Sequence, residues 1–558
     1  MRLANYIEDF EFFDKIKRFI KTGKSFAINS VSKICKVFLL HYFSKNKKIL
    51  LITDTEQTAI KYKNDLKTLF DTDAAIFPYQ DNGMYDATVP NIYKYAEQIS
   101  VLRNDAQIIL MPLRAAFEKF PTNDFFDENS IEVNLDDEID TAKLSERLTK
   151  MGYKKVTTVS DIGEFSIRGD TSDIYSLDQN PLRIELWGDT VTDLRYFDAD
   201  TQRSIEKTTT ATILPVSKFI RDEKSAQNFK KNSEKALKKY LKDKDDEEKE
   251  FFTQKYNELS ELISENFDFE GIEYFETVLN PDLKSILEQI SDEYTIIFDD
   301  YDEIKSKYKQ IDFNLQKRYE ENLKLPTILP LPKFAHPVYK DFLSYLQDKK
   351  KIYFDNLLSA EEIGCVAEAD TEPAPTFSAN LVNAVDFILK KREEHYKIII
   401  ATNYQKRVAE ILNEFEIPVS NNFDDLSDVY LINNTAFGGS ILNSFKLVIL
   451  TDKELFNKRS AEITVAKRKY RREKRIEDFS DIKVDDYVVH EIHGIGIFKG
   501  LSKLEFDGEL KDYLTIEYAG KDKLYVPAEQ ISMLCAYKGS GAIKPSLSKM
   551  GGADWTNI

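Results

Sequence analysis

The sequence predicts a multidomain α/β protein that ends in a small β-barrel. Continuous apolar runs such as Lys48–Thr53 and Gln107–Met111 alternate with helical patterns, which is typical of strands in a parallel sheet. Near the C-terminus, Leu514, Ile516 and Tyr518 alternate with polar residues, the period of a half-buried strand. The glycines at 494, 496 and 500 lie in the strand before it, where glycine marks bulges and corners.

Length and charge limit the class of protein. At 558 residues the chain is too long for one hydrophobic core, so about three to five domains are expected. Acidic residues outnumber basic ones by 96 to 78, giving a net charge of −18. A chain that binds nucleic acid over its whole surface is usually basic, so any DNA contact should be local.

Cysteine spacing and hydropathy indicate the compartment. The three cysteines lie far apart in the sequence and suggest neither a disulfide framework nor a thiolate metal site. The first nine residues carry acids where a signal peptide would be apolar, and no run of about 18 apolar residues exists. We therefore expect a cytoplasmic protein with no membrane partner.

The first half of the chain reads as an α/β unit with an insertion. Ser25–Asn29 is predicted to be a strand and Lys33–Phe43 a helix, and Lys48–Thr53 follows as a second strand. Between residues 121 and 205, short strands with turns between them suggest a small α+β insertion; they are Tyr153–Val159, Leu182–Trp187 and Thr190–Phe197.

The second half returns to the α/β pattern. Residues 222–266 are highly charged and helical in pattern, and Tyr294–Asp300 is a buried strand. A second α/β unit follows, with a helix at 404–415 and strands at Lys397–Ala401, Val429–Ile432 and Lys446–Leu450.

These patterns predict seven segments. They are the first part of an α/β domain (1–120), an α+β insertion (121–205), the rest of the α/β domain with charged helices (206–349), a second α/β domain (350–456), a basic linker (457–480), the β-barrel (481–540) and a tail (541–558).

The first α/β domain resembles a P-loop helicase sheet with a degenerate nucleotide site. Thr22-Gly-Lys-Ser25 lacks the first glycine of a P-loop, whose position is Arg18, and it precedes the strand instead of following it. The loop that does follow the strand, Asn29–Lys33, has no glycine to wrap a phosphate. Asp299 and Asp300 end a strand in the manner of a Walker B motif. We expect no catalytic residue and no bound ATP or Mg²⁺ in this chain.

Histidine spacing does not predict a metal site. His490 and His493 are separated by one residue too few for the zinc-protease motif, and their segment reads as strand and turn, so a structural role is expected. The other histidines are scattered, and no nucleophile set can be assembled.

Arginines recur beside aromatic residues in the insertion. Arg168, Arg183 and Arg195 occupy strand-like positions near Trp187 and Phe197. Arginines flanking an aromatic residue are the composition of a protein-binding hot spot. The alternative is a sheet with solvated arginines and aromatic residues in its core.

Three sequence motifs in this region resemble those of a known repair family. Arg168-Gly-x-x-x-Asp-Ile, Arg183-Ile-Glu-x-x-Gly-Asp and Phe197-Asp-x-x-Thr-Gln-Arg-Ser resemble the UvrA-binding domain of the excision-repair protein UvrB. The same domain occurs in the N-terminal module of the transcription-repair coupling factors, the Mfd family.

Other segments extend the resemblance over nearly the whole chain. Pro78-Tyr79, Met84–Asp86 and Val89-Pro90 resemble the first domain of both families. Phe437-Gly-Gly439 and Leu447–Asp452 resemble the third domain of Mfd. The segments Val484–Gly500 and Asp512–Pro527 resemble its RNA-polymerase-interacting domain, which UvrB lacks.

The resemblance implies a function and its residues. Arg168, Arg183, Trp187 and Arg195 would face UvrA, with Trp187 where the family often has phenylalanine. Leu504 matches an apolar position that the family presents to the β subunit of RNA polymerase, although a core leucine of the barrel is the alternative. The family continues into an ATP-dependent DNA translocase where this chain stops, so ATP and Mg²⁺ are expected only there. The implied function is an adaptor that binds RNA polymerase and UvrA in transcription-coupled DNA repair.

Two other functions stay open. One is a nucleotide-dependent helicase like UvrB, which would need a working phosphate loop. The other is an excision-repair scaffold that binds DNA without sequence preference through the basic segment 467–475, which contains Lys467, Arg468, Arg471 and Arg472.

Overall fold

The protein is described from a computed structural model. The structure describes residues 6, 10–79, 91–265, 267, 269, 271–290, 292–323, 328–331, 339–355, 358, 363–377, 381–421, 427–433, 435–457, 484–490, 494–506, 509–519, 523–527 and 534–536. The chain divides into two compact units, residues 1–463 and 464–558.

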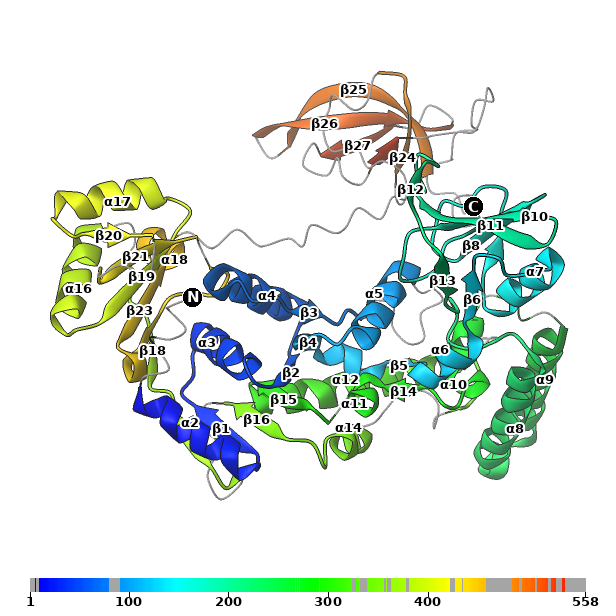
Figure 1. The fold of residues 1–558 in the computed structure, drawn as a ribbon, viewed down its shortest axis with the longest axis horizontal. Helices are drawn as coiled ribbons and strands as arrows, with labels where there is room; N and C mark the ends of the chain where they lie inside the picture. Colours follow the sequence, from blue (N-terminus) through cyan, green and yellow to red (C-terminus); the bar gives the residue numbers. More distant parts are fainter. Residues whose placement is uncertain are drawn as a thin grey trace. The chain divides into compact units, whose positions relative to one another are not determined.

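A seven-stranded parallel sheet is the centre of the first unit (Figure 1). Its strand order is β17-β1-β16-β15-β2-β4-β3 and every neighbouring pair is parallel, as the apolar runs predicted. The strands are β1 (Phe26–Asn29), β2 (Lys48–Thr53), β3 (Ala75–Ile76), β4 (Ile108–Pro112), β15 (Tyr294–Asp299), β16 (Lys351–Phe354) and β17 (Val366–Glu368).

Burial on both faces explains why these strands are continuously apolar. Ile49 and Leu51 of β2 belong to one hydrophobic core, whereas Leu50 and Ile52 belong to another. Successive side chains of a strand point to opposite faces, so a strand that is covered on both sides is apolar along most of its length.

Helices and short connecting elements surround this sheet. They are α2 (Glu11–Thr22), α3 (Lys33–Ser44), α4 (Glu56–Phe70), α5 (Ile92–Arg103), η1 (Leu113–Phe117), β5 (Lys119–Phe120), β14 (Lys284–Ser285), α11 (Ile286–Gln289), α12 (Tyr301–Asn322) and α14 (Tyr339–Tyr345). Side-chain caps explain where several begin; Ser32 caps α3, for example, by accepting a hydrogen bond from the Cys35 N–H.

The insertion forms a second, mainly antiparallel sheet of order β12-β11-β10-β9-β8-β7. Its elements are α6 (Asn123–Asn129), β6 (Ile131–Asn134), α7 (Thr141–Lys150), β7 (Lys154–Lys155), β8 (Glu164–Arg168), β9 (Thr171–Ile174), β10 (Leu182–Trp187), β11 (Thr190–Phe197), β12 (Ser204–Lys207) and β13 (Thr210–Ile213). The bounds of β10 and β11 match the prediction. The strand expected over 153–159 is shorter, and β13 pairs with β6, so strand pairing continues past residue 205.

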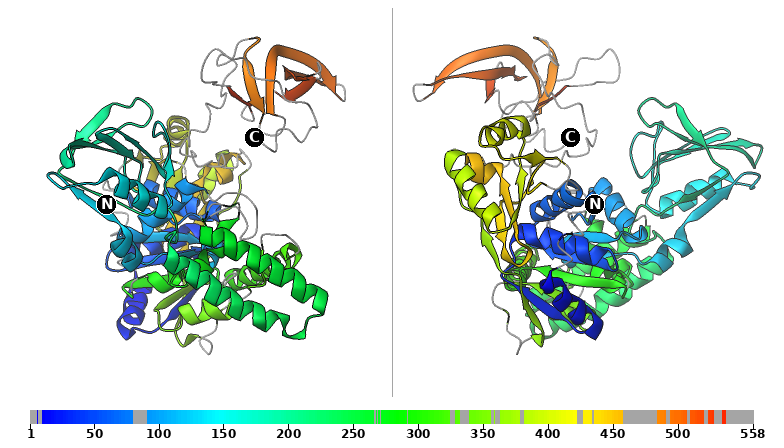
Figure 2. Two further views of the ribbon diagram at one scale, coloured as in Figure 1. Left: turned by 90° about the vertical axis from the view of Figure 1, so that its right-hand side faces the viewer. Right: turned by 60° about the vertical axis from the view of Figure 1, so that its left-hand side comes forward.

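The charged segment after the insertion is helical, as expected. Helices α8 (Glu223–Tyr240) and α9 (Asp246–Glu265) lie side by side, which Figures 1 and 2 both show. Phe229 and Ile263 belong to the apolar core beneath them, and the charged side chains fill the other faces. Short elements complete this region: η2 (Leu241–Asp243), η3 (Ile272–Phe275) and α10 (Glu276–Leu279).

A third sheet, of order β18-β22-β23-β19-β21-β20, has a parallel centre. Its elements are β18 (Thr371–Pro373), α16 (Leu381–Glu393), β19 (Lys397–Ala401), α17 (Gln405–Glu414), β20 (Val419–Ser420), β21 (Val429–Ile432), β22 (Ser440–Leu442), η4 (Asn443–Phe445), β23 (Leu447–Thr451) and α18 (Asp452–Phe456). Strands β16 and β17 fall within the predicted second α/β domain (350–456), but both pair with β1 in the first sheet.

The second unit contains a five-stranded antiparallel sheet of order β27-β26-β25-β24-β28. Its strands are β24 (Tyr487–His490), β25 (Gly494–Phe506), β26 (Glu509–Glu517), β27 (Lys523–Pro527) and β28 (Leu534–Ala536). Gly500 has a φ of +109° at a bulge, and a Cβ on Gly496 would lie 2.5 Å from Ile516 Cγ2, which explains both glycines. Among the described residues, the strand pairs do not include one between β27 and β28 that would close a barrel.

Candidate functional site

One face of the second sheet carries an ordered set of mostly charged residues together with Ser166 and Thr171, which we call the charged face. Strand register aligns them in two rows across β8 to β12. The first row is Ser166, Asp173, Arg183, Arg195 and Lys207, and the second is Arg168, Thr171, Glu185 and Asp193.

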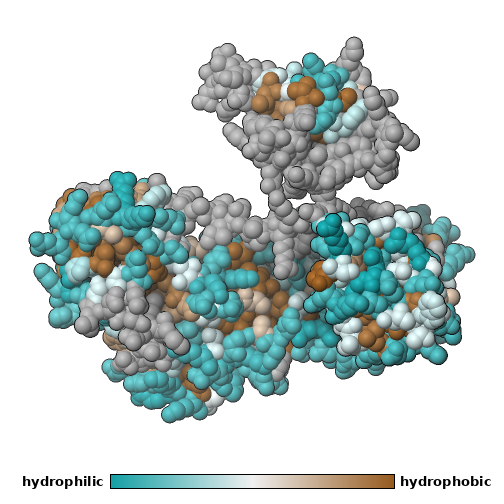
Figure 3. All heavy atoms as spheres, turned by 45° about the horizontal axis from the view of Figure 1, so that its top comes forward, coloured by the Kyte–Doolittle hydropathy of each residue, from teal (hydrophilic) through white to brown (hydrophobic). Residues whose placement is uncertain are grey.

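Strand alternation places Trp187 on the same face. Leu182, Ile184 and Leu186 of β10 are buried in the hydrophobic core, so the residues between them point the other way. Trp187 is 82% exposed, the most exposed of the large hydrophobic side chains among the described residues. Figure 3 shows that hydrophobic residues form separate patches among hydrophilic ones on the visible surface.

Asp173 organises the arginines of the charged face. Its side chain is 1% exposed and accepts hydrogen bonds from Arg183 Nε at 2.6 Å and Arg183 Nη2 at 2.9 Å. Arg168 Nη2 donates to the same carboxylate at 3.2 Å. The Arg183 guanidinium also lies 4.5 Å from the ring centroid of Phe197. Arg183 is therefore fixed in its position, whereas the Arg168 side chain stays 54% exposed.

Arg195 is held by a second set of carboxylates. It donates to Glu185 and Asp193, and Lys207 Nζ lies 2.6 Å from Asp193. The hydrogen bond to Glu185, with a smaller effect from Asp193, raises the pKa of Arg195 above its ordinary value. Only 18% of the Arg195 side chain is exposed.

The turn before β12 explains the Thr-Gln-Arg-Ser sequence. Gln202 has a φ of +58°, and its Nε2 donates to the carbonyls of Val159 at 3.0 Å and Ala199 at 2.8 Å. Its Oε1 accepts a long hydrogen bond of 3.4 Å from Arg183. The turn thus contacts Arg183 of the charged face and helps to hold it in place.

The structure brings the four predicted residues of this region to one face and separates them by exposure. Trp187 and Arg168 are open to a partner, whereas Arg183 and Arg195 are tied into ion pairs. Sequence reasoning quoted Asp173 within the motif that begins at Arg168 but gave it no role. The register of the β9–β10 hairpin, which pairs Asp173 with Arg183, is the signal that could have found it.

A second set of polar residues lies at the carboxyl edge of the first sheet; we call Asp299, Lys33, Lys36 and Tyr62 the Asp299 cluster. Strand β1 ends at Asn29 and α3 begins at Lys33, so only three residues separate strand from helix. Asp299, the last residue of β15, accepts from Lys33 Nζ at 2.7 Å and Lys36 Nζ at 2.6 Å. The Tyr62 hydroxyl donates to it at 2.9 Å.

These partners set the charge state of Asp299, which is fully buried. Burial raises the pKa of this carboxyl, but Lys36 and Lys33 have the larger combined effect and hold the pKa below its ordinary value. The cluster is therefore a buried carboxylate with two cations and a hydroxyl donor.

The predicted contact residue of the second unit lies on the long hairpin. Leu504 of β25 pairs with Lys511 of β26, and its side chain lies outside the described set. Val488, Phe498, Leu514, Ile516 and Tyr518 form the core of the sheet. The predicted DNA-contact residues Lys467, Arg468, Arg471 and Arg472 also lie outside the described residues, as does His493.

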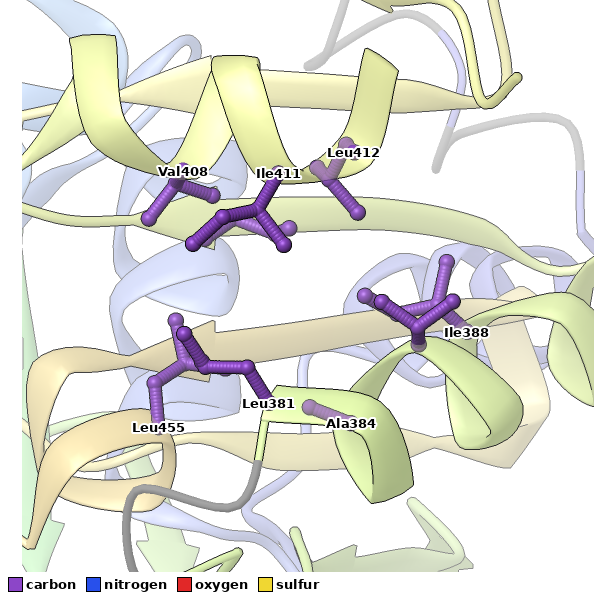
Figure 4. A pocket seen from close by; sticks show the side chains of 9 residues that line it. Leu381, Ala384, Ile388, Val408, Ile411, Leu412 and Leu455 are labelled. Atoms are coloured by element: carbon purple, nitrogen blue, oxygen red, sulfur yellow. The ribbon is translucent and has the colours of Figure 1, made fainter. Parts of the chain in front are cut away.

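Two further observations concern metal and small-molecule binding. The described residues contain no group of three or more His, Cys, Asp or Glu that could hold a metal ion. A cavity between α16 and α17 is lined by apolar residues of the two helices, among them Ile388 and Ile411, and by Ile400 of β19 and Leu455 of α18 (Figure 4). Within the part of the chain that is described, no helix combines the length and apolarity needed to cross a membrane.

Comparison with family models identifies two domains. Residues 131–219 match the UvrB interaction domain, a range that contains the whole charged face. Residues 482–538 match the CarD-like/TRCF RID domain, which spans the sheet of the second unit.

Comparison with whole proteins confirms the resemblance to the N-terminal part of the transcription-repair coupling factors. The chain is 28% identical to the transcription-repair-coupling factor of Bacillus subtilis over 98% of its own length and 49% of that protein. It is 24% identical to that of Staphylococcus epidermidis over 99% of its length, and to that of Staphylococcus aureus over 95%. The chain spans about half the length of these relatives.

Replacing Asp299 with asparagine should strongly destabilise the first unit. The change leaves Lys36, whose side chain is 5% exposed, without its carboxylate, at a cost of about 3–5 kcal/mol in the free energy of unfolding. Because the folded-state pKa of Asp299 is lowered, the stabilisation is present above pH ~4 and is lost as the pH falls through the folded-state value. Urea unfolding near neutral pH and below pH ~4 measures both effects.

Asp105→Asn is the matched control, because Asp105 pairs with Lys48 at the surface with its side chain 71% exposed. Its effect should stay below about 1 kcal/mol. Equal effects of the two substitutions would contradict a stabilising role of the Asp299 cluster.

Proposed function

We propose that this chain is an adaptor in transcription-coupled DNA repair. In this proposal the charged face of the second sheet binds UvrA, and the sheet of the second unit, which we take to be the predicted small barrel, binds the β subunit of RNA polymerase. The two domain matches and the similarity to transcription-repair-coupling factors over nearly the whole chain support this assignment.

The observation that carries the proposal is the exposure of Trp187 in the charged face. A tryptophan that is 82% exposed leaves a large apolar area in water, which a binding partner would remove. Arg168 lies on the same face with its side chain 54% exposed. Tryptophan and arginine are the residues most enriched in binding hot spots.

The ion pairs separate the four residues into two that are accessible and two that are held within the sheet. Trp187 and Arg168 are the contact residues, because both are accessible. Arg183 and Arg195 mainly position the face, because their charges are already paired with carboxylates of the same sheet. Charge reversal at Arg183 would put a glutamate beside the buried Asp173 and would disturb the sheet itself.

The second unit offers strand edges for the polymerase. In the described strand pairs, residues 500–506 of β25 pair only with β26, and residues 509–512 of β26 pair only with β25. Among the described strands, each segment thus has one edge of backbone N–H and C=O groups with no strand partner, and such an edge can add a strand from another protein. Leu504 lies within the first of these segments.

In this proposal the chain does not hydrolyse ATP. The loop between β1 and α3 is short and free of glycine, and Lys33 pairs with a carboxylate of the chain itself. The ATP-driven activity of a coupling factor would then belong to the half of the relatives that this chain does not match.

Truncation of Trp187 to alanine should weaken binding of purified bacterial UvrA by about 30-fold or more, the loss of a hot-spot side chain worth about 2 kcal/mol. Isothermal titration calorimetry of UvrA with the parent chain and the variant measures this change. Binding of RNA polymerase should be unaffected.

Phe313→Ala controls for the loss of an exposed aromatic, because Phe313 of α12 is 69% exposed and lies outside the charged face. It should leave UvrA affinity unchanged. Equal affinities of the parent and the Trp187 variant for UvrA would disprove the assignment of this face.

Substitution of Leu504 by arginine should abolish retention of purified bacterial RNA polymerase in a pull-down, because a charge would enter the proposed contact strand. Tyr525→Arg adds the same charge at a 42% exposed position of β27 and should leave retention intact. Circular dichroism establishes that both variants are folded. If the Leu504 variant does not fold, Leu504→Ala replaces it, and a folded variant that still retains polymerase would refute the contact.

A further inference from the structure

A loop of the third sheet is anchored on helix α4 of the first sheet. Asp65 of α4 is 1% exposed, and its two carboxylate oxygens accept the N–H of Ala436 at 2.6 Å and the N–H of Phe437 at 3.0 Å. Burial raises the pKa of Asp65 to about 7, although the two N–H groups lower it. The Phe437 ring packs edge-on against Tyr62, with ring centroids 4.7 Å apart.

The same loop is held from its own side by Glu454. The Gly439 N–H donates to Glu454 Oε2 at 3.0 Å, and the carboxylate also accepts from the Thr451 N–H at 3.0 Å. A Cβ on Gly439 would lie 2.4 Å from the carbonyl oxygen of Ile449, so only glycine fits there. The loop therefore presents Phe437 to α4 in a defined position.

Tyr62 joins this contact to the Asp299 cluster. Its ring packs on Phe437, and its hydroxyl donates to Asp299, which also accepts from Lys33 and Lys36. Tyr62, Asp299 and Phe437 are all buried. A continuous path of contacts thus runs from the carboxyl edge of the first sheet to the third sheet.

We propose that the Asp299 cluster supports the packing of the third sheet on the first. The cluster holds Tyr62 in position, and the Phe437 loop packs on Tyr62. In open α/β sheets the carboxyl edge of the strands is where a ligand usually binds. Here Lys33 and Lys36 share the single carboxylate of Asp299 at that edge, and a loop of the same chain packs on the neighbouring Tyr62. The inference goes beyond the adaptor proposal, which requires only the two binding surfaces.

This support has a consequence for the local stability of the Phe437 loop. A hydrogen bond to a buried carboxylate constrains the tyrosine ring, so its loss should loosen the loop without unfolding the first sheet. Because the N–H groups of Ala436 and Phe437 donate to Asp65 beside Tyr62, their hydrogen exchange reports on the contact directly.

Amide hydrogen exchange of the chain carrying Tyr62→Phe tests whether the hydrogen bond from Tyr62 to Asp299 supports the Phe437 loop. Exchange at Ala436 and Phe437 should accelerate by about tenfold or more, the effect expected when a hydrogen bond to a charged group is lost. Exchange at Ile296, whose N–H donates to Lys350 within the first sheet, should not change. Lys33→Gln, which weakens the cluster from its 40% exposed side, should give a smaller acceleration at the same two amides.

Tyr95→Phe is the matched control, because the buried hydroxyl of Tyr95 makes no hydrogen bond among the described residues. It should leave exchange at Ala436 and Phe437 unchanged. Unchanged exchange in the Tyr62 variant, or an equal acceleration at Ile296, would overturn the proposal.

Discussion

The cost of burying a carboxylate is the constraint on which the rest of this structure depends. An ionised carboxylate loses its hydration when it enters the protein, so it must be paired or protonated. Asp299 and Asp173 are both at most 1% exposed, and each is paired with two cationic side chains. The first pairing fills the carboxyl edge of the parallel sheet, and the second arranges the charged face of the insertion.

The surroundings of the two carboxylates differ in how accessible they are. At Asp299 the carboxylate is paired internally with Lys33 and Lys36, Tyr62 of α4 donates to it, and Phe437 of the third sheet packs on Tyr62. At Asp173 the arginines are positioned, but Trp187 and Arg168 stay accessible. The first arrangement suits a structural joint and the second suits recognition of another protein.

The sequence predicted elements well where one local pattern decides them. The runs Lys48–Thr53 and Lys397–Ala401 became strands with those bounds, because burial on both faces requires a continuous apolar run. The four residues expected to form a binding surface do share one face, because alternation along β10 fixes the direction of Arg183 and Trp187.

The sequence did not predict features that depend on distant pairing. Asp65 and Phe437 are 372 positions apart, and no local pattern indicates that the N–H of one meets the carboxylate of the other. Strands β16 and β17 joined the first sheet for the same reason, because their partner β1 lies more than 300 residues earlier in the chain. The role of Asp173 depended on hairpin register, which composition does not reveal.

The central claim is that one chain holds two partners at once. Size-exclusion chromatography of bacterial RNA polymerase mixed with UvrA, with and without this chain, tests it most directly. The account predicts that UvrA elutes with the polymerase only when the chain is present. Elution of the chain with one partner while the other stays separate, at concentrations where each binds alone, would contradict the adaptor function.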